Sequence, residues 1–193
     1  MTKKILLIPN MPNWSVDKRA RNIIKYNTSD LVIDSICFNE FLNEWEDLHE
    51  RYDLIFPMTN RLLHEFIQRR IPTDRVVTTI TSFASWDGGR TVPPGFNVTP
   101  PKSEIRALGK ALLVSACCRK LWYLFSGLVP LMHTAPTCDL DMFYPVERKR
   151  RSDRLVVGWT GSLSNNENLE TDIRGVASII KPACAAVEGV EFL

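Results

Sequence analysis

Residues 4–38 read KILLIPNMPNWSVDKRARNIIKYNTSDLVIDSICF, and this stretch decides the fold class. It contains two short apolar runs, Lys4–Ile8 and Leu31–Phe38, on either side of the amphipathic stretch Ser15–Tyr26. That stretch has one apolar helical face and one charged face that is expected to meet water. The apolar face carries Val16, Ala20, Ile23 and Ile24, and the charged face carries Asp17, Lys18, Arg21 and Lys25. A strand, a helix and a strand with short connections predict a right-handed β-α-β unit.

The same alternation continues along most of the chain. Further short runs rich in Ile, Leu and Val lie at Asp53–Pro57, Val76–Thr81, Ala111–Ser115 and Leu155–Trp159. Amphipathic stretches lie at Glu40–Arg51 and Leu62–Arg70, and the Gly- and Pro-rich segment Ser85–Lys102 is expected to be an irregular loop. Continuous apolar runs are typical of buried parallel strands. The sequence therefore predicts an α/β fold, with a Rossmann-like parallel sheet and helices on both faces.

Composition and charge narrow the class of protein. The chain has 193 residues, 45% of them apolar, so at roughly 150 residues per domain it holds one domain or a little more. Its 24 basic and 22 acidic residues give a net charge of +2, too balanced for a dedicated nucleic-acid binder. No apolar stretch reaches the roughly 18 residues of a membrane span, and the five cysteines form no C-x-x-C pair. We expect a cytoplasmic protein with free thiols and neither cofactor nor metal.

The charged segment Arg148–Arg154 separates two parts of the chain, and its composition suits an interdomain hinge. A strand, a loop, a helix over 169–187 and a second strand at 190–193 are expected after it. Two strands in about 40 residues cannot close a core of their own. We therefore predict a Rossmann-like domain over 1–147, a hinge over 148–154, and the incomplete start of a second domain over 155–193.

Two glycines mark a candidate phosphate-binding loop in that second part. Gly158 and Gly161 follow a predicted buried strand and precede a helix. Glycine there allows the backbone to approach a ligand closely, and free amides at a helix start attract phosphate oxygens. Ligands of open α/β sheets bind at the carboxyl ends of the strands. Glycine in this place also simply terminates strands.

The string Thr137–Pro145, TCDLDMFYP, resembles the G-V-D-x-x-x-F-x-P signature of retaining GT-B glycosyltransferases of family four. Asp139, Phe143 and Pro145 match three of its positions, and Thr137 stands at the glycine. In that family the signature connects an acceptor-binding domain to a nucleotide-sugar-binding domain. The segment 156–162 resembles the first strand and glycine loop of the latter. The resemblance assigns the donor phosphates to Gly158, Thr160, Gly161 and Ser162.

The resemblance implies transfer of a sugar from a nucleotide diphosphate donor, with retention at the anomeric carbon and without a metal. Its acceptor would be a glycan, a lipid-linked molecule or a small molecule. The acceptor-binding candidates are Asn10, Asp17, Arg19, Thr59 and Ser82. A solvated helix face is the alternative for Asp17 and Arg19. Asn-Met-Pro-Asn replaces the family's Gly-Gly acceptor loop, and the family's remaining donor-site residues would fall beyond Leu193, so no catalytic residue is assigned.

Three alternatives stay open. Asp139 and Asp141 spell the D-x-D with which another glycosyltransferase class holds a divalent metal. The α/β pattern also suits a non-catalytic module that binds a nucleotide or a protein partner, although no G-x-G-x-x-G follows the first strand. The apolar segment Leu121–Met132 could dock on the inner face of a membrane that carries a lipid-linked acceptor, or it could pack in the core.

Overall fold

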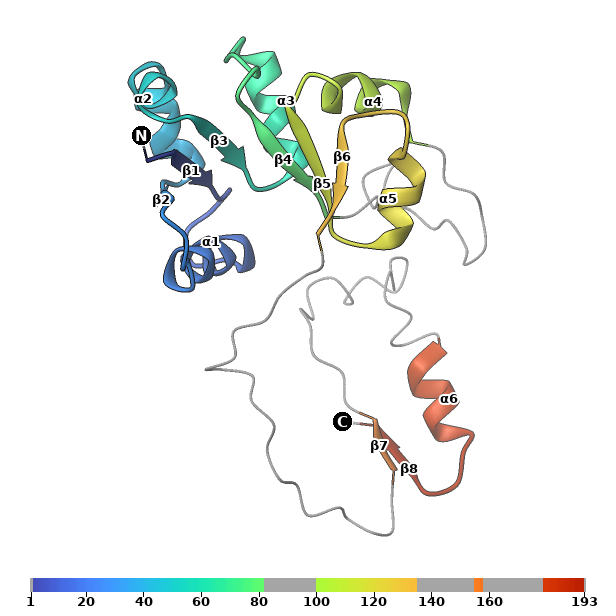
Figure 1. The fold of residues 1–193 in the computed structure, drawn as a ribbon. Helices are drawn as coiled ribbons and strands as arrows, with labels where there is room; N and C mark the ends of the chain where they lie inside the picture. The colour runs from blue at the N-terminus through green and yellow to red at the C-terminus, as the bar shows by residue number, and fades with distance from the viewer. Residues whose placement is uncertain (1, 82–99, 135–154, 158–178, 193) are drawn as a thin grey trace. The chain divides into compact units, whose positions relative to one another are not determined.

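The computed structural model describes residues 2–81, 100–134, 155–157 and 179–192 (Figure 1). The chain divides into two compact units. Among the described residues, the first unit holds 2–81 and 100–134, and the second holds 155–157 and 179–192. The predicted hinge over 148–154 lies outside these residues, so the predicted domain boundaries stay a prediction.

The first unit is a parallel α/β structure. Its strands are β1 (Lys4–Ile8), β2 (Val32–Ser35), β3 (Leu54–Pro57), β4 (Val77–Ile80), β5 (Leu113–Ala116) and β6 (Leu131–His133). Its helices are α1 (Ser15–Lys25), α2 (Phe38–Arg51), α3 (Asn60–Gln68), α4 (Lys102–Leu108) and α5 (Arg119–Phe125). The strands form two parallel three-stranded sheets, in the orders β2-β1-β3 and β4-β5-β6. The predicted α/β class with parallel strands is therefore confirmed.

A proline explains why β3 and β4 form no continuous ladder. The Ile55 N–H points to the β4 side and donates to the Arg75 carbonyl at 3.0 Å, and Ile55 makes an isolated parallel bridge with Val76. The next backbone nitrogen on that side belongs to Pro57, which has no N–H to donate. The Thr78 hydroxyl instead donates to the Pro57 carbonyl at 2.9 Å. The two sheets thus lie side by side, in the strand order 2-1-3-4-5-6.

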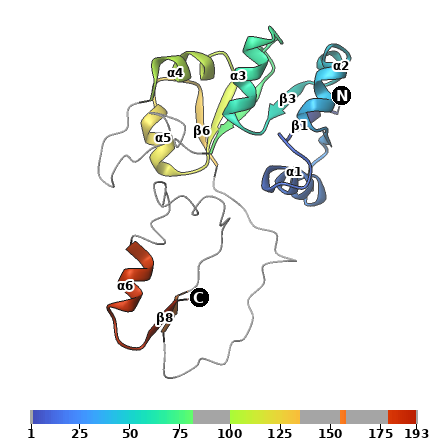
Figure 2. The same cartoon turned by 180° about the vertical axis from the view of Figure 1, so that it is seen from behind.

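Helices cover opposite faces of the β1 region, as Figures 1 and 2 show for α1 and α2. On one face, Ala20 of α1 packs with Leu7 and Met58 in a buried cluster. On the other, the rings of Phe41 in α2 and Phe66 in α3 stack with centroids 5.1 Å apart, and both are fully buried. Complete burial of one such side chain contributes roughly 1.5–3 kcal/mol. This apolar packing holds the sheet and orients its carboxyl edge.

Several expectations for this unit are corrected. Asp17 was expected to face water, but it is only 5% exposed, because its carboxylate turns back to the preceding loop. Ile24 was expected on the apolar face, but it is 38% exposed. The predicted irregular loop included Lys102, whereas Lys102 is the first residue of α4. The segment Leu121–Met132 is divided between α5 and β6, with Leu121 and Phe125 in the core and others exposed.

The second unit contains the parallel strands β7 (Leu155–Val157) and β8 (Val190–Phe192) and the short helix α6 (Lys181–Ala185). Leu155 pairs with Val190, so the predicted strand pair is present in parallel register. Only part of the helix expected over 169–187 lies within the described residues. A left-handed glycine, Gly189 at φ +77°, precedes β8. Parallel strands separated by more than thirty residues fit a β-α-β crossover.

Candidate functional site

The carboxyl edge of the first unit's sheet contains a topological switch point. The chain moves from β1 to β2 on one side, and returns to form β3 on the other side of β1. The loops after β1 and β3 therefore lead away on different sides, and ligands of doubly wound sheets bind at such a point. Asn10 follows β1 and Thr59 follows β3. The Met58 N–H donates to the Ile8 carbonyl at 3.0 Å, which holds the two loop starts together.

Asn10 has an unsatisfied polar atom at this switch point. Its Oδ1 is buried and has no hydrogen-bond partner in the part of the chain that the structure describes. A buried acceptor without a donor costs about 1–3 kcal/mol. Thr59 lies at the start of α3, and its hydroxyl makes no capping hydrogen bond. The edge thus offers the Asn10 Oδ1 acceptor, which lacks a donor, and the Thr59 hydroxyl, which can donate or accept a hydrogen bond.

Asp17 organises the loop between β1 and α1. Its Oδ2 accepts hydrogen bonds from the Asn13 backbone N–H and from the Arg21 guanidinium, both at 2.7 Å. Arg21 also donates to Asn13 Oδ1 at 3.2 Å, and Asn13 has a left-handed backbone with φ 63°. The solvated-face alternative is therefore wrong for Asp17. Its carboxylate is used inside the loop, where it fixes the turn that follows Asn10.

Arg19 is exposed and its charge reaches the end of β5. Burial raises the pKa of the Cys117 thiol, Cys118 raises it further, and the Arg19 guanidinium lowers it in part. The Cys117 thiol donates to the Thr81 carbonyl at 3.4 Å, which ties the ends of β4 and β5 together. Arg19 and the loop after β5 therefore share the carboxyl edge of the sheet.

The thiols of Cys37 and Cys117 are poor nucleophiles. Burial raises the pKa of Cys37, and Asp17 and Glu40 raise it further. A thiol with a raised pKa is protonated at neutral pH, whereas the thiolate is the reactive form. Four cysteines are free within the described residues, namely Cys37, Cys117, Cys118 and Cys184.

A chain of hydroxyl groups at the carboxyl edge was missed by the sequence reasoning. Thr79 of β4 and Ser115 of β5 lie 3.3 Å apart between hydroxyl oxygens, and Ser115 lies 2.5 Å from the Thr134 hydroxyl after β6. Thr79 and Ser115 are buried. The only signal for them was the presence of polar residues in otherwise apolar strands. The chain links three neighbouring segments at the edge where the site lies.

Several predicted residues lie outside the described residues. They are the acceptor candidate Ser82, the signature residues Asp139, Phe143 and Pro145, the D-x-D residue Asp141, and the donor-phosphate candidates Gly158, Thr160, Gly161 and Ser162. Within the described ranges, no group of three or more His, Cys, Asp or Glu side chains could hold a metal ion. None of the described helices is long and apolar enough to cross a membrane.

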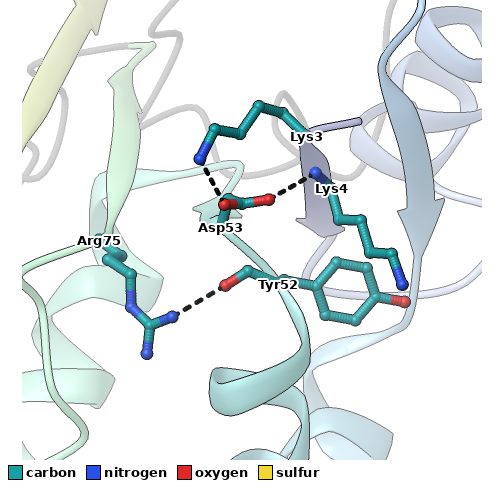
Figure 3. A network of polar contacts seen from close by, with 5 residues as sticks. All are labelled: Lys3, Lys4, Tyr52, Asp53 and Arg75. Atoms are coloured by element: carbon teal, nitrogen blue, oxygen red, sulfur yellow. Dashed lines mark hydrogen bonds and ion pairs between the residues drawn. The ribbon is translucent and has the colours of Figure 1, made fainter. Parts of the chain in front are cut away.

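A second polar cluster lies at the opposite, amino edge of the sheet (Figure 3). A hollow of about 240 Å³ lies beside it. Asp53 accepts from Lys3 Nζ at 2.7 Å and from the Lys4 N–H at 2.9 Å, and these bonds lower its pKa. Arg75 donates to the Tyr52 carbonyl at 3.1 Å. These groups pair with one another across the starts of β1, β3 and β4, so the cluster is structural.

Comparison of this chain with protein-family models, with curated proteins and with solved structures found no match. The site therefore rests on its own geometry: a parallel sheet, a switch point with an orphan acceptor, and an exposed arginine beside it.

Proposed function

We propose that the chain belongs to a GT-B-type glycosyltransferase that transfers a sugar from a nucleoside diphosphate donor to a hydroxyl-bearing acceptor without a metal. In this proposal residues 1–147 bind the acceptor, 148–154 form a hinge and 155–193 begin the donor domain. The observation that carries the proposal is the buried Asn10 Oδ1 at the β1/β3 switch point, with no partner among the described residues. An acceptor hydroxyl supplies the donor that this oxygen needs.

The acceptor half of the proposed mechanism is positioning. Asn10 accepts a hydrogen bond from one hydroxyl of the acceptor, and Thr59 contacts a neighbouring polar group. Asp17 holds the loop through Asn13, so that Asn10 keeps its place when the acceptor binds. Holding two reactants in a near-attack geometry replaces a bimolecular encounter with an effectively intramolecular step.

The donor half of the proposed mechanism is electrostatic. Sugar transfer passes through an oxocarbenium-like transition state, in which negative charge develops on the departing diphosphate. Backbone amides at Gly161 and Ser162 would stabilise that charge. The family resemblance assigns these two residues to the phosphates of the sugar donor. The parallel strands β7 and β8 support a Rossmann-like start of the donor domain. Two units with parallel strands, separated by the D-x-x-x-F-x-P signature, fit the two-domain architecture of the proposal.

The test is sugar transfer by the protein purified from its natural source. The protein is incubated in EDTA with UDP-, GDP- and ADP-sugars labelled in the sugar, together with polar and lipid extracts as acceptors. We expect release of a nucleoside diphosphate and labelled product from one donor. Recombinant Asn10→Ala should transfer about tenfold more slowly, since it loses one buried hydrogen bond to the acceptor. Asn43→Ala, an exposed asparagine of α2, should leave the rate unchanged.

The outcomes separate the proposal from its alternatives. Transfer only after Mg²⁺ or Mn²⁺ is added overturns the metal-independent mechanism and favours the D-x-D class. Binding of a sugar nucleotide with no transfer overturns the catalytic proposal and favours a binding module. Equal rates for Asn10→Ala and the native protein remove Asn10 from the acceptor site.

A further inference from the structure

The two three-stranded sheets of the first unit are joined by few backbone contacts. Between β3 and β4, the Ile55 N–H donates to the Arg75 carbonyl, and Ile55 forms an isolated bridge with Val76. Pro57 has no N–H with which to continue the ladder, and its carbonyl accepts from the Thr78 hydroxyl instead. In contrast, β1 pairs with β3 at four register positions, and β4 pairs with β5 at four. Among the described strands of this unit, the junction between β3 and β4 is therefore the neighbouring pair with the weakest backbone connection.

One arginine supports this junction at its amino end. The Arg75 guanidinium donates to the Tyr52 carbonyl at 3.1 Å, two residues before β3 (Figure 3). Its Nη2 lies 2.8 Å from Nδ1 of His49, which belongs to the last turn of α2. Arg75 itself precedes β4 by two residues. These two contacts, the Arg75 brace, therefore connect the start of β4 to the start of β3 and to the end of α2.

The Arg75 brace requires a neutral imidazole. A guanidinium has only donors, so Nδ1 of His49 accepts the hydrogen bond and the ring proton lies on Nε2. His49 is 8% exposed, and its Nε2 is buried without a hydrogen-bond partner among the described residues. A buried imidazole that accepts from a permanent cation is disfavoured in its charged form.

Charged and polar groups of both kinds face His49. Burial and the Arg75 guanidinium lower its pKa, whereas Asp74, the Pro72 carbonyl and Glu50 raise it. The Asp74 carboxylate lies 3.8 Å from His49 Nε2 and 3.9 Å from Arg75 Nε. Its side chain is 70% exposed, so water screens its charge. Asp74 is therefore placed to pair with either cation without holding His49 in the charged form at neutral pH.

Protonation of His49 is incompatible with the Arg75 brace. A proton on Nδ1 replaces the acceptor lone pair with a second donor, and it places two cations at hydrogen-bond distance. The guanidinium then has to leave the ring, while Asp74 remains beside the imidazolium as a counter-charge. Because the Arg75 carbonyl also accepts from the Ile55 N–H, displacement of Arg75 loosens the adjoining backbone link between the sheets.

We propose that protonation of His49 opens the amino end of the β3–β4 junction, so that the first unit contains an acid-sensitive hinge between its two sheets. The hydrogen bond from Thr78 to the Pro57 carbonyl keeps the other end of the junction closed. Asn10 follows a strand of one sheet and Ser115 lies in the other, so the hinge changes the angle between the groups that the two sheets bring to the carboxyl edge. This inference does not depend on the proposed function.

The test follows the Ile55 amide by hydrogen exchange, measured by NMR on the full isotope-labelled chain between about pH 8 and about pH 5. Exchange rates are converted to protection factors, which removes the intrinsic effect of pH on amide exchange. Met58 and Val114 are the internal references, because their N–H groups donate within the first and the second sheet, to Ile8 and Pro130. The ring nitrogens of His49, observed in the same samples, report when the proton binds.

Two variants hold the Arg75 brace in one state, and a third is a control. His49→Gln does not titrate, and its amide oxygen can still accept from Arg75. Arg75→Gln removes the guanidinium at every pH. His64→Gln is the matched control, because it removes a half-buried histidine of α3 whose partner is Glu104.

We expect the protection factor of Ile55 to fall about tenfold as His49 takes up its proton, because one buried hydrogen bond is loosened. Met58 and Val114 should keep their protection. In Arg75→Gln, the Ile55 amide should show the lower protection already at about pH 8.

The two histidine variants decide whether His49 is responsible. His49→Gln should abolish the fall at Ile55, and His64→Gln should behave like the native chain. The proposal is overturned if the protection of Ile55 does not follow the titration of His49, or if it falls equally in His49→Gln. Loss of protection by the same factor at Met58 and Val114 also overturns it, because that result indicates global unfolding and no hinge.

Discussion

Replacing Asp17 tests whether one buried carboxylate holds the loop that presents Asn10. Asp17 is 5% exposed, and its Oδ2 accepts two hydrogen bonds, from the Asn13 N–H and from Arg21, each at 2.7 Å. A hydrogen bond to a charged group contributes about 1.5–3 kcal/mol, whereas an i,i+4 ion pair with an exposed partner contributes about 0.3–0.5 kcal/mol. The Arg21 side chain is 62% exposed, so its ion pair with Asp17 contributes the smaller amount. The hydrogen bond from Asn13 therefore stabilises the loop more than the ion pair with Arg21 does.

We expect Asp17→Ala to lower the free energy of unfolding by about 2 kcal/mol, and Asp17→Asn, which keeps one acceptor oxygen, by about half as much. Urea denaturation followed by circular dichroism measures both. Lys18→Ala, an exposed neighbour on the same helix, should stay within about 0.5 kcal/mol of the native chain. Amide hydrogen exchange gives the local result, because the Asn13 N–H should lose its protection in Asp17→Ala. An Asn13 amide equally protected in both proteins, or an equal loss of stability in Lys18→Ala, would refute this reasoning.

Three further predictions concern other parts of the chain. Burial and Arg75 lower the pKa of His49 below 6.5, and protons therefore bind the unfolded chain more readily than the folded one. The free energy of unfolding should be highest above pH 6.5 and should fall as the pH drops below that value. His49→Gln should reduce the dependence of the free energy of unfolding on pH. If the urea midpoint of His49→Gln varies with pH as it does in the native chain, the assignment to His49 is wrong. Phe66→Ala should cost about 3–5 kcal/mol in urea denaturation, because Phe66 is fully buried and stacks on Phe41, and a cost below 1 kcal/mol would show that the site collapses. Gly189→Ala should destabilise the second unit by about 1 kcal/mol through its φ of +77° alone, since no atom lies within 4 Å of the added methyl group. Hydrogen exchange at Val190 measures this effect, and equal or slower exchange in the variant would argue against it.

Local sequence patterns predicted every described strand except β6, and they predicted the helices α1, α2, α3 and α6. A buried parallel strand has to be apolar on both faces, so runs such as Lys4–Ile8 are visible without any knowledge of their neighbours. Helix α1 was equally visible, because its apolar residues recur at the helical period. The short helices α4 and α5 were missed, since seven residues give too few turns for a periodic pattern. The strand β6 was hidden for a similar reason, within an apolar run that α5 shares.

The candidate site depended on contacts that no local pattern encodes. The sequence alone determined that Asn10 and Thr59 follow strands, but their meeting depends on the order β2-β1-β3, which is a property of the whole sheet. Asp17 fits a charged helix face by its spacing, yet its carboxylate is buried because the Asn13 N–H four residues earlier needs an acceptor. Arg19 and Cys117 lie nearly one hundred residues apart along the chain, and only the tertiary structure places the guanidinium where its field reaches the thiol. Periodicity reports which side of an element avoids water, whereas a site is made by the ends of several elements, and chain topology alone brings those ends together.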